Sequence, residues 1–300
     1  MFEGAFSGLG FQLKERPWEQ PVELLWQDLC RGRRVATDGC VAGCEAVPAE
    51  LADFRQQYSG HETSALKELG RDLAHALEAT ARHCEPGETE SEIAGQIAHR
   101  LTHHQATPVQ LQVAGDGRRA RFRHWAHSDT PVRRFVTLSA VARRQGLHVA
   151  ATRTVCFGDA PKDLVDAHHH ASMVLAIGMF FSKTGWTIGE CWSRVARIYE
   201  KFGAPDEWRL SDQGELTGYR PCEVPIVPGG AGKFQTGHIV SWHPSIRTAA
   251  VGETIQVQPE GFLHLTNSPN WPKLGIQVKG TEILLPAILC RDATSEWCIG

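Results

Sequence analysis

The sequence predicts an α+β fold, because two helical stretches followed by strand-like segments occur in the same order twice along the chain. The first helical stretches span about 61–84 and 89–104, and the second pair spans 162–181 and 188–202. With 42% hydrophobic and 22% charged residues, the composition is typical of a folded globular protein. The repeated order also indicates internal two-fold character.

In the first half, apolar residues recur at spacings of three and four along 61–84, which predicts an amphipathic helix with one buried face. This face carries Leu66, Leu69, Leu73, Leu77 and Ala81. A Glu-Pro-Gly break follows, and Thr89 with Glu92 forms a capping-box pattern that begins the next helix. Strands are expected over 109–113, 135–142 and 148–157, where apolar and polar residues alternate or β-branched residues are frequent.

In the second half, the two helices are separated by a Lys-Thr-Gly break at 183–185. Strands are expected near 215–219, 238–242, 254–258 and 262–266. The first 58 residues offer only one helix, over 21–30, and one short strand, over 34–37. We therefore expect a reduced N-terminal lobe over 1–58 and a main domain over 59–300.

The charge balance excludes several function classes. Lys and Arg total 31 against 34 Asp and Glu, a net charge of −3, so neither nucleic acid nor an anionic membrane is an expected partner. The longest apolar run, 173–181, is about half as long as a membrane-spanning helix requires. The first residues lack a basic, apolar leader pattern, so a cytoplasmic location is expected.

The nine cysteines are scattered. Cys40 and Cys44 have a spacing that zinc sites tolerate, but no second pair lies near them in the sequence, so a structural zinc site is not expected. Buried thiols in a reducing compartment are the simpler interpretation.

Several segments resemble, in order, the M24 family of Xaa-Pro aminopeptidases, prolidases and creatinase. They are RFRHWAHSDTPVRRFVTLSAVARRQGLHVAATRTVCFG (121–158), PDEWRLSDQGELTGYRPCE (205–223), SWHPSIRTAAVGETI (241–255) and LTNSPNWP (265–272). The resemblance runs from about residue 62 to the C-terminus, and it implies the pita-bread fold of creatinase and methionine aminopeptidase. It also implies a homodimer that acts on a small-molecule substrate.

Peptidases of this family hold two divalent ions with two Asp, one His and two Glu, which balance the charge around a bridging water. Carried over by the resemblance, these five positions fall on Ser139, Ala150, Glu215, His243 and Gly252. Only Glu215 and His243 can still coordinate an ion, and two ligands do not hold a dinuclear centre. We therefore expect no metal and no other cofactor.

Creatinase is the family's precedent for catalysis without a metal ion, and its acid–base histidine corresponds most closely to His124. An imidazole passes protons in both directions near neutral pH. With His243 and Glu215 as further proton-transfer groups, the chain is expected to be a metal-independent enzyme on a small amino-acid-derived metabolite. Hydrolysis, elimination and decarboxylation all remain open.

Five further residues are candidates for substrate binding. A guanidinium at Arg153 could bind a carboxylate in bidentate fashion, or form a buried ion pair instead. A nucleophilic thiolate at Cys222 would need a neighbouring cation, which the sequence does not show. The others are Gln213, Tyr219 and Glu223. Consecutive histidines at 168–170 face different directions on a helix, so they cannot share a metal ion.

Two alternatives remain open. The chain could be a non-catalytic relative that binds a ligand or a protein partner. It could also be a hydrolase with one residual metal ion, held by His243, Glu215 and another histidine.

Overall fold

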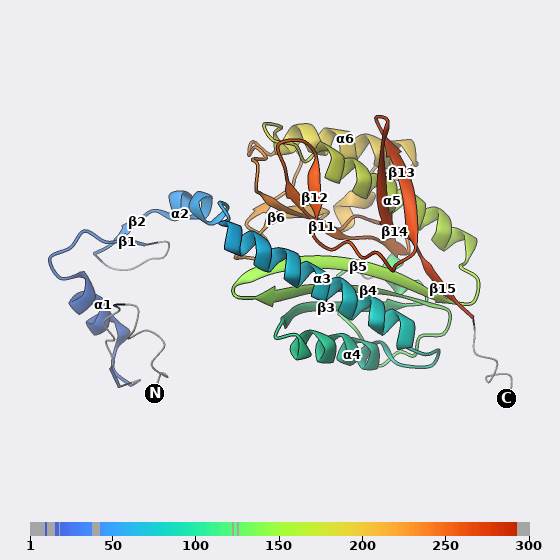
Figure 1. Cartoon of the computed structure of the whole chain (residues 1–300), viewed down its shortest axis with the longest axis horizontal. Helices are drawn as coiled ribbons and strands as arrows, with labels where there is room; N and C mark the ends of the chain where they lie inside the picture. Colours follow the sequence, from blue (N-terminus) through green and yellow to red (C-terminus); the bar gives the residue numbers. More distant parts are fainter. Residues whose placement is uncertain are drawn as a thin grey trace. The chain divides into compact units, whose positions relative to one another are not determined.

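The computed structural model describes residues 10, 16–17, 19–37, 43–121, 123–124 and 126–292, without the side chains of 48–50. The chain divides into two compact units between Phe54 and Arg55. Figure 1 shows the helices and strands of both units. The expectation that the N-terminal segment is a reduced lobe stays a prediction.

The first unit contains few regular elements among its described residues. Its helix α1 (Val22–Cys30) lies where the sequence predicts one, and it has no buried residue. Short strands β1 (Ala36–Thr37) and β2 (Glu45–Ala46) form a parallel pair. Helix α2 (Pro48–Arg55) follows, up to the boundary. Cys40, one of the two cysteines with zinc-compatible spacing, lies outside the described residues.

The first half of the second unit is a helical pair on a four-stranded sheet, as the periodicity predicts. Helices α3 (Gly60–His83) and α4 (Glu90–His103) pack on the sheet, and each begins with a capping box. All five residues of the predicted apolar face of α3 are buried. The strand order is β15 (Leu289–Arg291), β5 (Leu147–Phe157), β4 (Phe135–Arg144) and β3 (Thr107–Gly115).

The second half repeats this plan. Helices α5 (Lys162–Phe181) and α6 (Ile188–Lys201) accompany a five-stranded sheet. The short helix η3 (Glu207–Leu210) lies in a connection of this half, and η2 (Arg118–Ala120) lies between β3 and β4 of the first half. The strand order is β12 (Phe262–His264), β11 (Glu253–Val257), β8 (Ile239–Trp242), β6 (Gly214–Thr217) and β7 (Val224–Pro225). The predicted α+β order is therefore confirmed.

Two small hairpins complete this unit, and the sequence patterns did not predict them. They are β9 (Ser245–Ile246) with β10 (Ala249–Ala250), and β13 (Lys273–Val278) with β14 (Thr281–Pro286). Among the described residues, no helix has both the length and the apolar character to cross a membrane.

The two halves meet where β5 runs beside the start of β11. The backbone N–H of Thr152 donates to the carbonyl of Gly252 at 3.0 Å, in an isolated antiparallel bridge. The Thr254 hydroxyl donates to the carbonyl of Ala150 at 2.7 Å and accepts from its N–H at 2.9 Å. These bonds fix the separation of the two sheets at one point.

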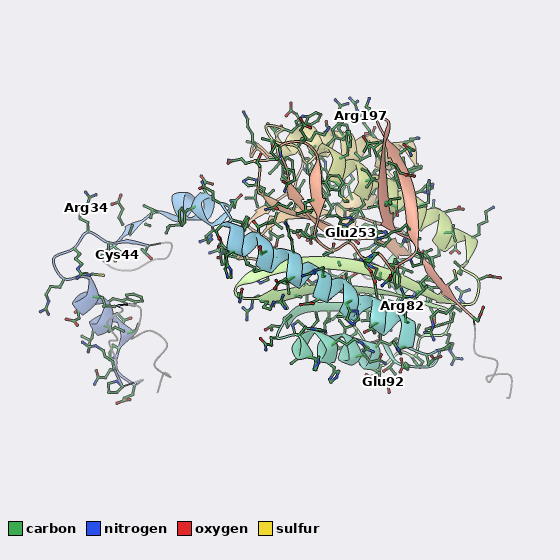
Figure 2. The ribbon with its side chains drawn as sticks, in the orientation of Figure 1. Arg34, Cys44, Arg82, Glu92, Arg197 and Glu253 are labelled. Carbon is green, nitrogen blue, oxygen red and sulfur yellow. The ribbon has the colours of Figure 1, made fainter. Side chains whose placement is uncertain are left out.

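A buried ion-pair cluster at Arg153 strengthens this junction. Its Nε donates to Glu78 of α3 at 3.0 Å, its Nη2 donates to the Thr266 carbonyl at 2.8 Å, and its Nη1 donates to Glu253 of β11. Glu253, labelled in Figure 2, is fully buried and also accepts from His264 at 2.6 Å. Burial raises the pKa of Glu253, but Arg153 and His264 outweigh it and hold the pKa below its ordinary value.

Replacing Arg153 tests this junction. Arg153→Met should lower the free energy of unfolding by about 3–5 kcal/mol, because Glu78 and Glu253 would stay buried without their cation. Arg209→Met is the matched control: Arg209 and its partner Asp206 are 67% and 80% exposed. Arg209→Met should lower the free energy of unfolding by less than about 1 kcal/mol. Chemical denaturation measures both, and equal losses would contradict a special role for the Arg153 cluster.

Candidate functional site

A cavity of about 140 Å³ lies at the junction of the two sheets. It is lined by residues of β3, β4 and β5 from the first half and by residues beside β6, β8 and β11 from the second. All five positions that the resemblance assigns to metal ligands line it: Ser139, Ala150, Glu215, His243 and Gly252.

On the first-half side of the cavity, hydroxyl groups and small side chains stand at the ligand positions. Ser139 of β4 and Thr152 of β5 are cross-strand partners, and their hydroxyl oxygens lie 2.9 Å apart. A Cβ atom at Gly252 would lie only 2.8 Å from the Thr152 hydroxyl. The Thr152 side chain therefore occupies the space that a side chain at Gly252 would enter.

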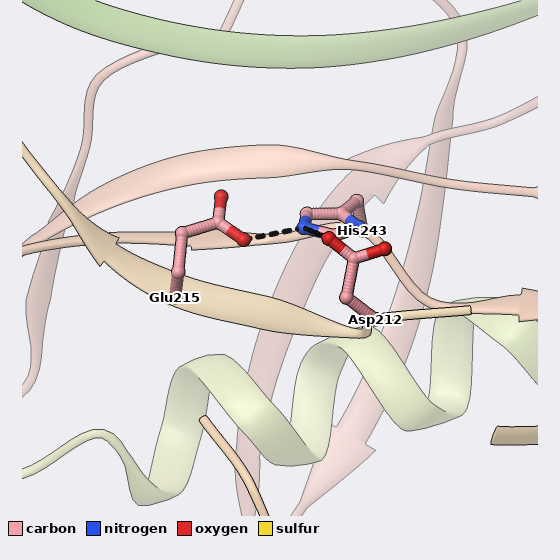
Figure 3. Close-up of side chains that lie close together, drawn as sticks. All are labelled: Asp212, Glu215 and His243. Carbon is pink, nitrogen blue, oxygen red and sulfur yellow. Dashed lines mark hydrogen bonds and ion pairs between the residues drawn. The ribbon is translucent and has the colours of Figure 1, made fainter. Parts of the chain in front are cut away.

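On the second-half side, an acid–base group remains (Figure 3). Glu215 lies on β6 and His243 directly follows β8, which pairs antiparallel with β6. The Nε2 atom of His243 lies 2.7 Å from Glu215 Oε2 and 3.9 Å from Asp212 Oδ2. Strand pairing thus brings residues 28 positions apart in the sequence into direct contact.

The charges of these carboxylates change the protonation of His243. Burial lowers its pKa, but attraction to Glu215, the hydrogen bond to Glu215 and the charge of Asp212 outweigh burial and raise the pKa to about 9. At neutral pH His243 is therefore an imidazolium that donates Nε2–H to Glu215. Its side chain is still 27% exposed, so a ligand in the cavity can reach it.

His124 lies at the rim of the same cavity, and Asp212 connects it to the buried group. Its Nε2 atom is 3.5 Å from Asp212 Oδ1, and the two side chains are 60% and 63% exposed. Asp212 was not among the candidate residues predicted from the sequence. The signal was its position three residues before Glu215, with both acids beside the start of a strand.

Two arginines, also missed in the sequence, line the cavity from the segment around η2. Arg119 and Arg123 are each 8% exposed. Burial and the neighbouring Arg123 lower the pKa of Arg119 to about 10, against an opposing effect of Asp212. The guanidinium of Arg123 pairs with Glu207 of η3. The available signal was an Arg pair four residues apart, before a predicted strand.

Of the predicted substrate-binding residues, only Cys222 lines the cavity. Burial and the charges of Glu215, Asp212 and Glu223 raise the pKa of its thiol. No cation counters this effect among the causes of the shift, so the thiolate form is disfavoured.

The other four predicted residues do not line the cavity, and each of them bonds to another protein group. Arg153 is held in its buried ion pairs, which was the alternative interpretation of this residue. Gln213 donates to the Ser211 carbonyl at 2.7 Å and accepts from the Tyr199 hydroxyl. The hydroxyl of Tyr219 donates to Glu62, and Glu223 pairs with Arg55 at 3.4 Å.

The histidine run on α5 does not converge. His168 is buried, and burial lowers its pKa to about 4, whereas His169 is exposed. At most one of the three faces inward, as the helical geometry predicts.

The residues present do not fit a dinuclear metal centre. Three of the five positions carry no carboxylate or imidazole, and the Thr152 side chain fills the space at Gly252. One ion is a different case: Asp212, Glu215 and His243 offer three ligand atoms within 4.8 Å of one another. A single ion there would have to displace the proton of His243.

Replacing Glu215 tests the electrostatics of this group. In chelator-treated protein, Glu215→Gln should lower the pKa of His243 from about 9 towards its ordinary 6.5, because the main favourable charge is gone. NMR titration of the histidine ring protons measures it. Glu223→Gln is the control, since Glu223 pairs with Arg55 instead.

The same shift has a consequence for stability. A raised pKa in the folded state means that the His243–Glu215 pair stabilises the fold fully below about pH 6.5 and loses its effect as pH rises through about 9. Glu215→Gln should therefore destabilise the protein more at pH 6 than at pH 10. An equal loss of unfolding free energy at both pH values would contradict this stabilising role of the His243–Glu215 pair.

Comparisons with known proteins support the fold. Residues 64–278 match the family profile of metallopeptidase family M24. No curated protein matches the sequence. Many solved structures match.

Three of these structures illustrate the likeness. Dipeptidase PepE from Mycobacterium ulcerans has a TM-score of 0.76 at 17% identity, over 96% of this chain and 80% of that one. The prolidase from Pyrococcus horikoshii OT3 has a TM-score of 0.74 at 17% identity, over 83% and 78%. The Xaa-Pro dipeptidase from Bacillus anthracis has a TM-score of 0.69 at 21% identity, over 76% and 67%.

Proposed function

The chain belongs to metallopeptidase family M24 and has the pita-bread fold, and from this premise we propose that it hydrolyses a small amino-acid-derived metabolite without a metal ion. The observation that carries the proposal is the acid–base series His124, Asp212, His243 and Glu215, which lines the cavity and includes two of the family's metal positions, Glu215 and His243. Of the five positions that hold metal ligands in the family, two still carry titratable side chains, but the complete set of five ligands is not present.

Two histidines on either side of Asp212 suit a reaction that takes up one proton and releases another. In hydrolysis, a water molecule attacks the substrate carbon, and His124 accepts the proton of that water. The imidazolium of His243 donates a proton to the leaving nitrogen. Asp212 orients His124, and Glu215 keeps His243 protonated until it donates.

The size of the cavity supports a small substrate. Its volume of about 140 Å³ is well below the range of about 300–1,000 Å³ that is typical of sites for drug-sized ligands. Its lining includes the ionisable side chains of Arg119, Arg123, Asp212, Glu215 and His243, which favours an enzyme over a non-catalytic relative that binds a protein partner. We further propose a homodimer, as the family resemblance implies, and a cytoplasmic location, as expected from the sequence.

A second candidate function has its own supporting observation. The three ligand atoms of Asp212, Glu215 and His243 lie within 4.8 Å, which is the arrangement that a hydrolase with one metal ion would use. In that case the ion would supply a Lewis acid, and the 2.7 Å contact between His243 and Glu215 would have to open.

Metal analysis and chelation separate these functions. We expect protein purified without chelator to contain no stoichiometric Zn, Mn or Co, and to keep its hydrolytic activity in EDTA. The substrates are a panel of Xaa-Pro dipeptides, N-acyl amino acids and guanidino acids. Stoichiometric metal that is lost in Asp212→Asn would support the single-metal hydrolase and contradict the main proposal.

Replacing either histidine tests the proton-transfer roles. His124→Ala and His243→Asn should each lower kcat/KM by roughly 10²–10⁴-fold, the usual contribution of a general acid or base. His169→Ala is the control, because His169 is exposed on α5, outside the cavity lining. An unchanged rate in either cavity variant would contradict its role, and no turnover by wild-type protein would favour the non-catalytic alternative.

A further inference from the structure

Two buried arginines in the cavity wall have more hydrogen-bond donors than the surrounding protein satisfies. Among the described residues, Arg119 Nε, Arg123 Nε and Arg123 Nη1 are buried and have no partner. Within the described part of the chain, the Nη1 and Nη2 atoms of Arg119 hydrogen-bond only to Gln112 Oε1, each at the long distance of 3.4 Å. Both side chains are more than nine-tenths buried, and both line the cavity.

Such an arrangement is unfavourable for the protein alone. Charged donors removed from water lose hydration, and that loss is recovered only when acceptors replace the water. Arg153, the remaining buried arginine among the described residues, shows the usual solution, since it reaches an acceptor with each of its three nitrogens. The missing acceptors beside Arg119 and Arg123 therefore point to a ligand in the cavity.

The local charge selects the kind of ligand. Glu207 pairs with Arg123, so the two guanidinium groups and this carboxylate leave one net positive charge. One positive charge matches a carboxylate, whereas a phosphate dianion would leave an excess negative charge. Planar guanidinium groups also match the two oxygens of a carboxylate in bidentate geometry.

The wall formed by Asp212, Glu215 and His243 has the reverse character. It carries two carboxylates, and the Nε2 atom of His243 lies 2.7 Å from Glu215 Oε2 and 3.9 Å from Asp212 Oδ2. A ligand with an anionic end and a nitrogen-bearing end is complementary to both walls. We propose that Arg119 and Arg123 bind the α-carboxylate of an amino-acid-type substrate, with its nitrogen towards Asp212, Glu215 and His243.

This inference names the substrate class of the proposed function and rests on it for its catalytic meaning, but binding alone tests it. The probes are the proteinogenic L-amino acids and their N-acetyl derivatives, each paired with its C-terminal amide. Melting shifts first identify the acids that bind, since a ligand of the folded state raises the melting temperature. Calorimetry then gives their affinities. We expect at least one acid to bind more than about 10-fold tighter than its amide.

The variants locate the carboxylate. Arg119→Met and Arg123→Met should each weaken the binding of that acid by about 10- to 100-fold and bring acid and amide to similar affinity. Arg121→Met should leave the ratio unchanged, because Arg121 belongs to the same segment but is exposed and does not line the cavity. Arg119→Lys, which keeps the charge but loses the planar fork, should give an intermediate loss.

Three results would overturn the inference. The first is that no acid shifts the wild-type melting temperature more than its amide does. The second is that inorganic phosphate binds more tightly than every acid. The third is that the ratio of acid to amide affinity stays the same in both methionine variants. The wild-type comparison stands even if a variant fails to fold. A protein that binds acids through these arginines but turns nothing over would refute the proposed function and keep this inference.

Discussion

The contact between β5 and β11 is the interaction on which the rest of the main unit depends. The Thr152–Gly252 bridge and the two bonds between Thr254 and Ala150 set the spacing of the two sheets. The cavity lies beside this contact, and its walls come from both sheets. Directly behind it, Arg153 connects α3, β5 and β11 through buried charges. Because a buried charge without its partner is strongly unfavourable, this cluster tolerates little relative movement of the two halves.

Much of the fold could be predicted because its signals are local. Leucine spacing in α3 and the capping box at Thr89 depend only on residues within a few turns of one another, and both occur in the structure. The hairpin of β13 and β14 was missed, because its strands lie beyond the last strand that the alternation pattern predicted. Prediction of tertiary neighbours needs information that such patterns do not contain.

The site shows the same limit. The family resemblance assigned five positions to one centre, and the structure brings all five to one cavity. Asp212, Arg119 and Arg123 were missed because they come from connections between strands and helices, one of them the short helix η2, whose course no periodicity predicts. Arg153 was selected from the segment that resembles the family, but the sequence could not show that its guanidinium turns away from the cavity towards Glu78 and Glu253.

Gly252 stands where the family pattern has a glutamate, and this has a consequence for redesign of the protein. A Cβ atom at position 252 would lie 2.8 Å from the Thr152 hydroxyl, which itself lies 2.9 Å from the Ser139 hydroxyl, so Thr152 would have to shift to admit a larger side chain. A dinuclear centre of the family type would also need carboxylates in place of Ser139 and Ala150. Engineering this chain into a metallopeptidase is therefore a task of several coordinated substitutions, and a single exchange at Gly252 would not accomplish it.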